Sequence, residues 1–538
     1  MRLSRLRYLT RSCFLLLVTL TTVGPFSVVD AASKPNIVLI LADDLGIGDL
    51  SCLNPQSKIT TPHCDRLARE GIVFTDAHSA SAVCTPSRYG LLTGRYCWRS
   101  KLQSGVLGGL SPRLIEPNRR TLAQCLADQG YNTACIGKWH LGMDWTVLPG
   151  KTVQELSIEQ RDQVRNVDYS AGITNGPLSL GFQHYFGISA SLDMVPYGYL
   201  RDNHLTAELT QDRSFLMMAG RPNGGTTRQG PTAADFQADQ VLRDLTSEAV
   251  KTIETAAKST ETPFFLYLPL ASPHTPILPT KEWDGKSGLN PYADFVLQTD
   301  HAIGEILAAL DRENLTQNTL VIVTSDNGCS PQAQYPELLA KGHNPSGPYR
   351  GHKADLFEGG HRIPLILRWP ARITSPRTTP ALVGLTDLYA TIAAILEVPL
   401  APDEAEDSLS FLPILLGETE HRRPPLVCHS INGSFAIREQ RWKLLLCPGS
   451  GGWSTPRPNR DDTSHLPLVQ LYDLEKDIAE QTNRQAQEPE IVSRLIRKLE
   501  DLVANGRSTP GPPQQNSVEV NIWQAGKQAH RPRISPKN

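Results

Sequence analysis

No long run of like charge occurs in this chain, and its formal net charge is only −2 over 538 residues. Proteins that bind nucleic acid usually carry clustered Lys and Arg, because contacts to phosphate dominate their affinity. The even spread of both signs therefore argues against a nucleic-acid partner. It favours a small or polysaccharide substrate.

The chain also lacks an apolar run of the about 20 residues that a membrane-spanning helix needs. Its longest candidate, Cys13–Val23, is shorter, follows the basic segment 1–7 and leads to the small residues Ala31, Ala32 and Ser33. This order is typical of a cleaved secretory signal. We therefore predict a signal peptide over residues 1–32, no stable membrane insertion, and export to the periplasm or the extracellular space.

No cluster of His or Cys offers zinc its usual ligands at a recognisable spacing. Removal of the signal leaves an odd number of cysteines for an oxidising compartment, so one of them should have a special role. They are Cys52, Cys64, Cys84, Cys97, Cys125, Cys135, Cys329, Cys428 and Cys447. The others could form disulfides of unknown pairing or remain buried thiols, and Cys125 and Cys135 have the apolar neighbours of core residues.

Short, continuous apolar runs rich in branched residues predict strands that are buried on both faces. The clearest are Asn36–Ala42, Thr319–Thr324 and Pro263–Leu270, with Thr133–Ile136 as a weaker candidate. Polar residues cluster directly after each run. Ligands of parallel sheets bind beyond the carboxyl ends of the strands, so this clustering indicates the site.

Helical periodicity separates these strands, at Arg120–Gln129, Ala234–Lys258 and Pro291–Asn314. Alternating strands and helices predict an α/β fold with a large, mostly parallel central sheet flanked by helices. A hairpin at 435–446 and a helix at Glu490–Val503 predict a smaller C-terminal α+β subdomain, an antiparallel sheet plus a helix.

The predicted boundaries follow changes of composition. Residues 145–231, rich in Gly, Pro, Asn and Tyr, are expected to form long loops that shape substrate choice. The Pro-rich and acidic stretch 400–425 is typical of a linker, and the Pro- and Gln-rich tail from Ser508 is typical of disorder. We thus predict a catalytic domain over 33–400, a subdomain over 401–507 and a disordered tail over 508–538.

Two acidic and amide pairs, Asp43-Asp44 and Asp326-Asn327, each follow a predicted buried strand. Either pair alone is more often a turn or a helix cap. Four oxygen-bearing side chains brought together at two strand ends instead favour a hard cation such as calcium or magnesium.

Cys84 begins a predicted helix, with Arg88 one turn further on the same face. A helix amino terminus and a guanidinium both favour negative charge there, which suits an anionic nucleophile or a bound anion. Without further modification Cys84 could serve as the thiolate of a cysteine hydrolase, with His274 or His140 as base. An ordinary structural cysteine is the other alternative.

The pattern Cys84-Thr-Pro-Ser-Arg88, followed by Leu91-Leu-Thr-Gly-Arg95, resembles the signature of the formylglycine-dependent (type I) sulfatases. Further matching motifs are Gly-Lys-Trp-His around Lys138 and His140, Ser-Pro-His-Thr-Pro around His274, and Arg-Gly-His-Lys ending at Lys353. The resemblance spans about residues 34–396. It is strongest to the arylsulfatase A-like branch of the alkaline phosphatase superfamily.

The resemblance implies that Cys84 is oxidised to formylglycine by a formylglycine-generating or sulfatase-maturing enzyme. It implies one calcium ion, held beside residue 84 by Asp43, Asp44, Asp326 and Asn327, with the modified Cys84 itself at the metal.

It also implies roles for the basic residues. Arg88 and Lys138 would orient the aldehyde hydrate, and Lys353 would offset charge on the sulfate. His274, helped by Lys353, would protonate the leaving oxygen, and His140 would act as the base that regenerates the aldehyde. The hydrate's second hydroxyl allows that last step, which a serine could not perform.

The implied activity is hydrolysis of sulfate esters of carbohydrates or aryl alcohols. Two alternatives remain at this stage: a phosphonate or phosphodiester hydrolase of the same superfamily, and a catalytically silent carbohydrate-binding relative. Candidate substrate contacts, each of which could equally be structural, are Asp193, His343, Arg350, His352 and His429.

Overall fold

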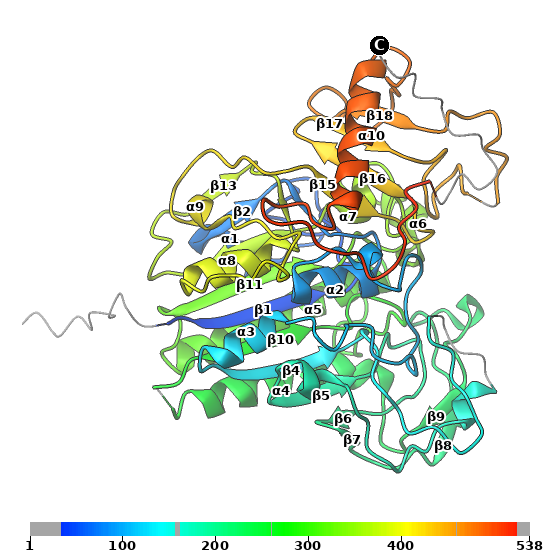
Figure 1. The fold of residues 1–538 in the computed structure, drawn as a ribbon. Helices are drawn as coiled ribbons and strands as arrows, with labels where there is room; N and C mark the ends of the chain where they lie inside the picture. The colour runs from blue at the N-terminus through cyan, green and yellow to red at the C-terminus, as the bar shows by residue number, and fades with distance from the viewer. Residues whose placement is uncertain (1–33, 157–161, 260, 459, 524–538) are drawn as a thin grey trace, which may run out of the picture. The chain divides into compact units, whose positions relative to one another are not determined.

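The computed structural model describes residues 34–156, 162–259, 261–458 and 460–523, and a ten-stranded sheet lies at its centre (Figure 1). The predicted signal peptide falls outside the described residues. The strands in spatial order are β13 (Arg377–Thr379), β2 (Ile72–Phe74), β12 (Leu365–Arg368), β11 (Thr319–Ser325), β1 (Asn36–Ala42), β10 (Phe264–Pro269), β4 (Asn132–Lys138), β5 (His184–Ile188), β6 (Leu200–Arg201) and β7 (His204–Leu205).

The five middle strands, from β11 to β5, run parallel, and antiparallel strands flank them on both sides. In β1, Ile37 aligns with Leu320 of β11 and with Phe265 of β10, and all three side chains are fully buried or nearly so. Burial on both faces explains why these strands are continuous apolar runs. The predicted large, mostly parallel sheet is confirmed.

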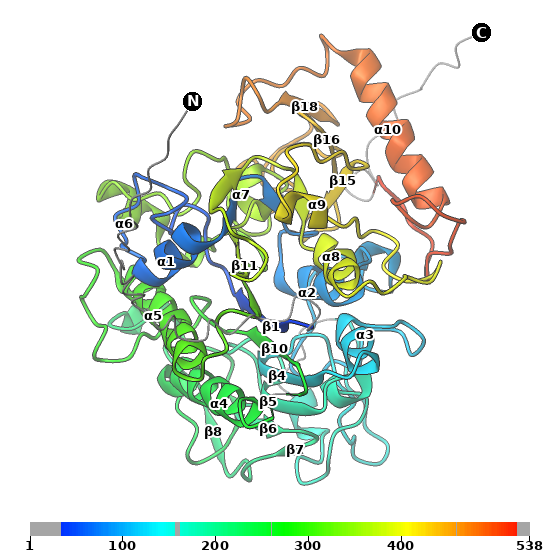
Figure 2. The ribbon, with the colours of Figure 1, turned by 90° about the vertical axis from the view of Figure 1, so that its left-hand side faces the viewer.

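Helices cover both faces of the sheet, as the view along the strands shows (Figure 2). One face carries α1 (Pro62–Glu70), α4 (Val241–Ala256) and α5 (Pro291–Arg312). The other carries α2 (Cys84–Thr93), α3 (Leu122–Asp128) and α8 (Asp387–Ile395). Local sequence sets two helix starts: Thr121 and Gln124 form a capping box at α3, and the Asn290 side chain caps α5 ahead of Pro291.

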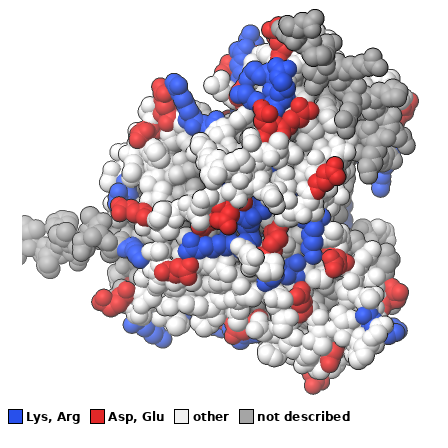
Figure 3. Space-filling view, viewed as in Figure 1, with Lys and Arg blue, Asp and Glu red and all other residues white. Residues whose placement is uncertain are grey.

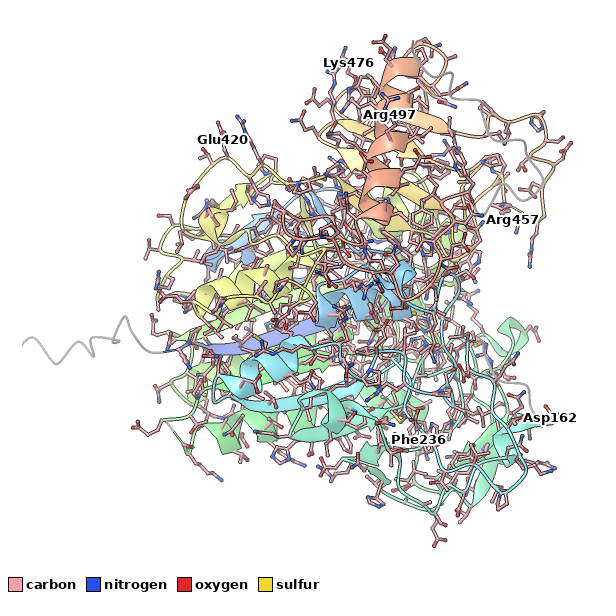
Figure 4. The ribbon with its side chains drawn as sticks, viewed as in Figure 1. Asp162, Phe236, Glu420, Arg457, Lys476 and Arg497 are labelled. Carbon is pink, nitrogen blue, oxygen red and sulfur yellow. The ribbon has the colours of Figure 1, made fainter. Side chains whose placement is uncertain are left out.

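The C-terminal part contains a four-stranded antiparallel sheet made of β15 (Leu426–His429), β16 (Phe435–Glu439), β17 (Trp442–Leu445) and β18 (Gln470–Asp473). Helix α10 (Pro489–Ala504) packs on it through Leu495 and Leu499. Figure 4 labels Arg497 on this helix and Lys476 just beyond β18. The predicted subdomain of antiparallel sheet plus helix is confirmed, and its core is continuous with Trp98, which follows α2.

Shorter elements complete the fold: β3 (Ala77–His78), β8 (Gln211–Arg213), β9 (Gly230–Thr232), α6 (Tyr335–Ala340), α7 (Glu358–His361), β14 (Val383–Gly384) and α9 (Leu412–Leu415). Within 145–231 the expected loops are tied down by an aromatic cluster. Phe236, labelled in Figure 4, has its ring centroid 5.2 Å from Tyr199 and 6.0 Å from Phe215. These loops are therefore anchored to the main hydrophobic core.

Three acidic residues of the predicted linker, Glu404, Glu406 and Asp407, are buried. Asp407 accepts hydrogen bonds from Arg99 at 2.9 Å from both Nε and Nη2, and Glu406 pairs with Arg119 at 2.8 Å. A flexible linker would leave such carboxylates in water. Composition alone missed this, because charged residues are buried only where partners from distant segments meet them.

The prediction of a disordered tail is wrong for residues 508–523. The Gln515 carbonyl accepts a hydrogen bond from Arg95 Nη2 at 2.7 Å, and the Asn516 side chain accepts one from Arg99 Nη1 at 2.8 Å. Ile522 is buried against the C-terminal sheet. Buried arginines thus supply the donors that hold a polar segment in place.

All nine cysteines in the described part of the chain are free thiols, and eight of them, Cys125 and Cys135 included, are buried. Over the same residues, no helix has the length and apolar character needed to cross a bilayer. Acidic and basic side chains are interspersed on the face shown in Figure 3, in keeping with the near-neutral charge.

Candidate active site

The candidate residues gather at the carboxyl ends of four neighbouring strands, β11, β1, β10 and β4. Asp43 and Asp44 follow β1, and Asp326 and Asn327 follow β11. Lys138 is the last residue of β4. Parallel pairing brings these ends to one edge of the sheet, which is why residues far apart in sequence meet there.

The acidic and amide pairs form one oxygen-lined group. Asp43, Asp44 and Asp326 each offer a carboxylate oxygen, and these oxygens all lie within 4.8 Å of one another in a fully buried position. Asn327 Nδ2 donates to Asp44 Oδ1 at 2.7 Å, which ties the second pair to the first. Three buried carboxylates this close require cations to offset their repulsion.

Two oxygens in this group fit a metal ion. Among the described residues, Asp43 Oδ1 and Asn327 Oδ1 are buried and have no hydrogen-bond partner. Buried polar atoms of this kind need an explanation such as an ion. Carboxylate and amide oxygens without imidazole or thiolate are the donor set of calcium or magnesium, so the residues present fit such a cation.

Cys84 is the first residue of α2, as predicted, and every residue of this helix is buried. Its thiol and one ligand atom each from Asp43 and His274 lie within 4.8 Å of one another. Arg88, one turn on, donates from Nε to Asp326 Oδ2 at 3.0 Å and from Nη1 to the Lys138 carbonyl at 2.8 Å. The helix start thus points residue 84 at the carboxylate group.

Two lysines reach the same carboxylates from opposite sides. Lys138 Nζ donates to Asp43 Oδ2 at 2.5 Å, and Lys353 Nζ donates to Asp44 Oδ2 at 2.9 Å. Gly137 makes the first approach possible, because its φ of 144° and the Pro269 carbonyl beside it leave no room for a Cβ. Both ammonium groups are buried and aimed at the site.

The two histidines differ in which ring nitrogen donates to a backbone carbonyl. His140 Nε2 lies 2.8 Å from the Leu107 carbonyl oxygen, which can only accept, so Nε2 carries the proton and donates the hydrogen bond. His140 Nδ1 is buried without a hydrogen-bond partner among the described residues. His274 Nδ1 lies 2.6 Å from the Thr275 carbonyl, and its Nε2 lies 3.6 Å from Asp44 Oδ2. His140 therefore presents a lone pair at Nδ1, and His274 can carry a proton at Nε2.

Charges in the site shift several pKa values. Burial, then Lys138 and Arg88, hold the pKa of His140 well below its usual range. Burial alone would raise the pKa of Asp43, but Lys138, His274 and Arg88 hold it well below. Burial and the neighbouring Asp43 raise the pKa of Asp326 to about 7. Such a rise is expected when one buried carboxylate lies beside another, and a bound cation would stabilise the charged form.

The backbone is strained at two of these positions. Asp44 has a φ of 63° and His140 a φ of 55°, in the left-handed region that side chains rarely adopt. Such conformations cost of order 1–3 kcal/mol each and concentrate at functional sites.

Comparison with known proteins identifies the family. The sulfatase family model matches residues 35–398. The N-acetylgalactosamine-6-O-sulfatase of Bacteroides thetaiotaomicron is 36% identical over 88% of this chain and 93% of its own length. The chain belongs to the sulfatase family. Human arylsulfatase A is also similar to this sulfatase, at 32% identity over 84% of this chain and 83% of its own.

A solved structure supports the same conclusion. It comes from work on the metabolism of multiple glycosaminoglycans by Bacteroides thetaiotaomicron and is 35% identical to this sulfatase. It aligns with a TM-score of 0.74, covering 87% of this chain and 99% of that chain. The family model matches most of the chain, and the named sulfatases align with it over most of their own length. The chain is therefore an enzyme of the sulfatase class, and the silent carbohydrate-binding alternative no longer applies.

Sequence reasoning missed Ser191 of this sulfatase as a site residue. Its Oγ lies 3.2 Å from Lys138 Nζ and 3.2 Å from His274 Nδ1, between two predicted catalytic groups. Ser191 lies in the stretch 145–231, and a serine in a Gly- and Pro-rich stretch carries no signal of its own. The neighbouring Asp193 accepts a hydrogen bond from Arg228 Nη1 at 2.8 Å.

The remaining candidate contacts have structural partners in this sulfatase. His343 Nε2 lies 2.9 Å from Asp49 Oδ1. Arg350 donates to the Glu480 carbonyl and lies over the ring of Phe357. His352 lies between Asp355 and Ser454, and His429 is buried against Phe435.

Proposed function

We propose that this sulfatase releases inorganic sulfate from sulfated carbohydrates, with residue 84 matured from cysteine to formylglycine and with one calcium ion. The calcium ligands would be Asp43, Asp44, Asp326, Asn327 and the modified residue 84. The observation that carries the proposal is the meeting of Cys84, Asp43 and His274 ligand atoms within 4.8 Å at a buried helix start. The two unpartnered oxygens of Asp43 and Asn327 support the cation.

When present, the calcium ion would supply positive charge to a sulfate oxygen and the formylglycine hydrate would supply a nucleophilic hydroxyl with a second one beside it. Arg88 and Lys138 then hold the reacting group in place. Arg88 is itself fixed by Asp326 and the Lys138 carbonyl, so its guanidinium is preorganised and does not reorient during the reaction. Lys138 Nζ, anchored by Asp43, adds positive charge next to residue 84.

His140 is the base. Its Nε2 proton is held by the Leu107 carbonyl, so the lone pair at Nδ1 is available to accept a proton from residue 84. Burial and the neighbouring cations favour the neutral form, as the lowered pKa indicates. The neutral imidazole can therefore accept a proton at Nδ1 in the step that releases sulfate.

His274 is the general acid. The Thr275 carbonyl holds the proton on Nδ1, and Ser191 Oγ supports the ring, so Nε2 faces the site. Because Nδ1 is protonated too, the ring must be an imidazolium to protonate the leaving alcohol oxygen from Nε2. Burial and Lys353 lower the pKa of His274, and the carboxylates of Asp43 and Asp44 act in the opposite direction and favour this charged form. Lys353, fixed on Asp44, places a second positive charge beside the departing group.

The proposed substrate class rests on the relatives. A sulfatase of N-acetylgalactosamine 6-O-sulfate is similar over nearly the full length of this chain, which favours a sulfated saccharide. The proposal includes export, because residues 1–32 have the composition of a secretory signal, and it requires a maturing enzyme as partner. Small aryl sulfates should serve as surrogate substrates.

The test compares sulfate and phosphate esters of one alcohol. We expect the sulfate ester of p-nitrophenol to be turned over with a kcat/KM well above that of its phosphate mono- and diesters. A panel of defined sulfated saccharides, with released sulfate measured, then identifies the natural class. Faster turnover of a phosphodiester or phosphonate would instead establish the alternative from the same superfamily.

Replacing His274 by Gln should lower kcat by about 10²–10⁴-fold on a sugar sulfate, whose alkoxide is a poor leaving group without a proton. The loss should be much smaller on p-nitrophenyl sulfate, since that phenolate leaves unaided. Steady-state kinetics on both substrates measure the difference. His343→Gln, which removes a buried histidine outside the site, should leave the ratio between the substrates unchanged, and equal losses on both substrates in His274→Gln would rule out the acid role.

A further inference from the structure

A second convergence of metal-ligating side chains lies outside the catalytic set. His78 in β3, His361 at the end of α7 and Cys428 in β15 each offer a ligand atom, and the three atoms lie within 4.8 Å of one another. His78 Nδ1 is 2.9 Å from His361 Nδ1, which is 3.4 Å from Cys428 Sγ. All three residues are buried. Sequence spacing does not reveal this cluster, because the fold joins three distant segments.

The outer nitrogens of both imidazoles face acceptors. His78 Nε2 lies 2.9 Å from Asp76 Oδ1, and His361 Nε2 lies 3.0 Å from the Leu356 carbonyl. A carboxylate and a carbonyl both accept, so each favours a proton on Nε2 and a lone pair on Nδ1. Metal-binding histidines show this arrangement, with the outer nitrogen donating to a carboxylate or a backbone carbonyl.

If both imidazoles carry their proton on Nε2, two Nδ1 lone pairs face each other at 2.9 Å, with a thiol beside them. Two lone pairs at hydrogen-bond distance repel unless a proton or a cation lies between them. Burial lowers the pKa of both histidines, which favours the neutral imidazoles that bind metals.

Cationic side chains near the cluster have carboxylate partners of their own. Lys443 Nζ is 3.0 Å from His361 Nε2, but it also lies 2.9 Å from Glu358 Oε1 and 2.8 Å from Glu480 Oε1. Arg438 Nη1 is 2.8 Å from His78 Nε2, and its guanidinium forms a two-pronged pair with Asp76. These ion pairs satisfy both cations without requiring the imidazole lone pairs.

We propose that His78 Nδ1, His361 Nδ1 and the Cys428 thiolate bind one zinc ion. Two imidazoles and one thiolate are ligands that zinc prefers. The Nδ1–Sγ distance of 3.4 Å is close to the spacing of two ligands of one tetrahedral zinc, and the Nδ1–Nδ1 distance of 2.9 Å would widen by a few tenths of an ångström on binding. A further oxygen, the Ser79 carbonyl, lies 3.6 Å from Cys428 Sγ and can complete the set. Binding releases the thiol proton of Cys428.

The zinc site would be structural. It joins β3, which precedes the helix of Cys84, to α7 and to the first strand of the C-terminal sheet. It shares no ligand with the proposed calcium site, so either site can be present without the other.

Cobalt is the probe, because a thiolate bound to Co²⁺ gives an intense charge-transfer absorption that oxygen ligands do not. The full chain would carry Cys84→Ala, which removes the active-site thiol, and would be produced with cobalt in the medium so that the buried site is loaded during folding. We expect about one thiolate-bound Co²⁺ per chain, as for a structural site of this ligand set. Absence of the absorption would overturn the proposal and leave a proton shared between the imidazoles.

Two further substitutions locate the thiolate. Cys428→Ser should abolish the absorption. Cys447→Ser should retain it, because Cys447 is buried in the same apolar cluster as Cys428 but its thiol contacts the Gly449 carbonyl and the Ser434 side chain instead of an imidazole. Absorption that survives Cys428→Ser would refute the assignment.

If Cys428→Ser does not fold, a measurement that needs neither substitution still tests the site. X-ray absorption of the zinc-loaded Cys84→Ala chain should show one sulfur at about 2.3 Å and imidazole nitrogens at about 2.0–2.1 Å. A first shell made only of oxygen and nitrogen would place the zinc elsewhere and contradict the site.

Discussion

Cys84→Ala should lower kcat for a sulfate ester by at least about four powers of ten, because it removes the proposed nucleophile on which the rest of the site would act. Cys84→Ser should be nearly as inactive in steady state, since a serine has no second hydroxyl through which a covalent sulfate can be released. Steady-state release of inorganic sulfate, followed by ion chromatography, measures both effects.

A matched control separates loss of the nucleophile from loss of a buried thiol. Cys97 is also buried, in the short helix that follows α2, and its thiol forms hydrogen bonds with Ser100 and the Leu102 carbonyl. Cys97→Ala should keep activity within a few-fold of the unsubstituted enzyme. If Cys84→Ala retained more than a tenth of the activity, residue 84 would not be the nucleophile.

Asp326→Asn is expected to have the second largest effect. It removes one of the three buried carboxylates, so bound calcium should fall from about one per chain to well below that in atomic analysis after dialysis. Activity should fall by about 10³-fold, because the charge that offsets the sulfate is lost. The ion and the activity should be lost together, and excess calcium should restore part of both.

Asp407→Asn provides the control for this change. Arg99 and Asp407 form a buried pair like that of Arg88 and Asp326, with Nε to carboxylate distances of 2.9 Å and 3.0 Å. Breaking either pair should destabilise the fold by about 3–5 kcal/mol. Only Asp326→Asn should lose calcium. Equal calcium content in the two variants would remove Asp326 from the ligand set.

The central sheet could be predicted from sequence because its buried strands are continuous apolar runs. Asn36–Ala42 is buried on both faces, so nearly every residue must be apolar, and its predicted ends coincide with those of β1. The strand ends then locate the acidic pairs, because parallel pairing brings carboxyl ends together. The candidate site residues were predicted from motifs, and the structure brings ligand atoms of Asp43, Asp44, Asp326, Cys84 and His274 together in two overlapping groups.

What the sequence could not show depends on contacts between distant segments. Ser191 lies between Lys138 and His274 only because its loop folds over the strand ends. Asp407 lies in a stretch with the composition of a linker, and its burial follows from the distant residue Arg99 that pairs with it. His78 and Cys428 have no recognisable spacing, since three separate segments bring them to His361.

The most direct test of the central claim is mass spectrometry of the tryptic peptide Glu70–Arg88 from a preparation that turns over sulfate esters. The account predicts that residue 84 is present as formylglycine, detected as an aldehyde that reacts with a hydrazide probe, in proportion to the activity of the preparation. A fully active preparation in which residue 84 is entirely an unmodified cysteine would contradict it.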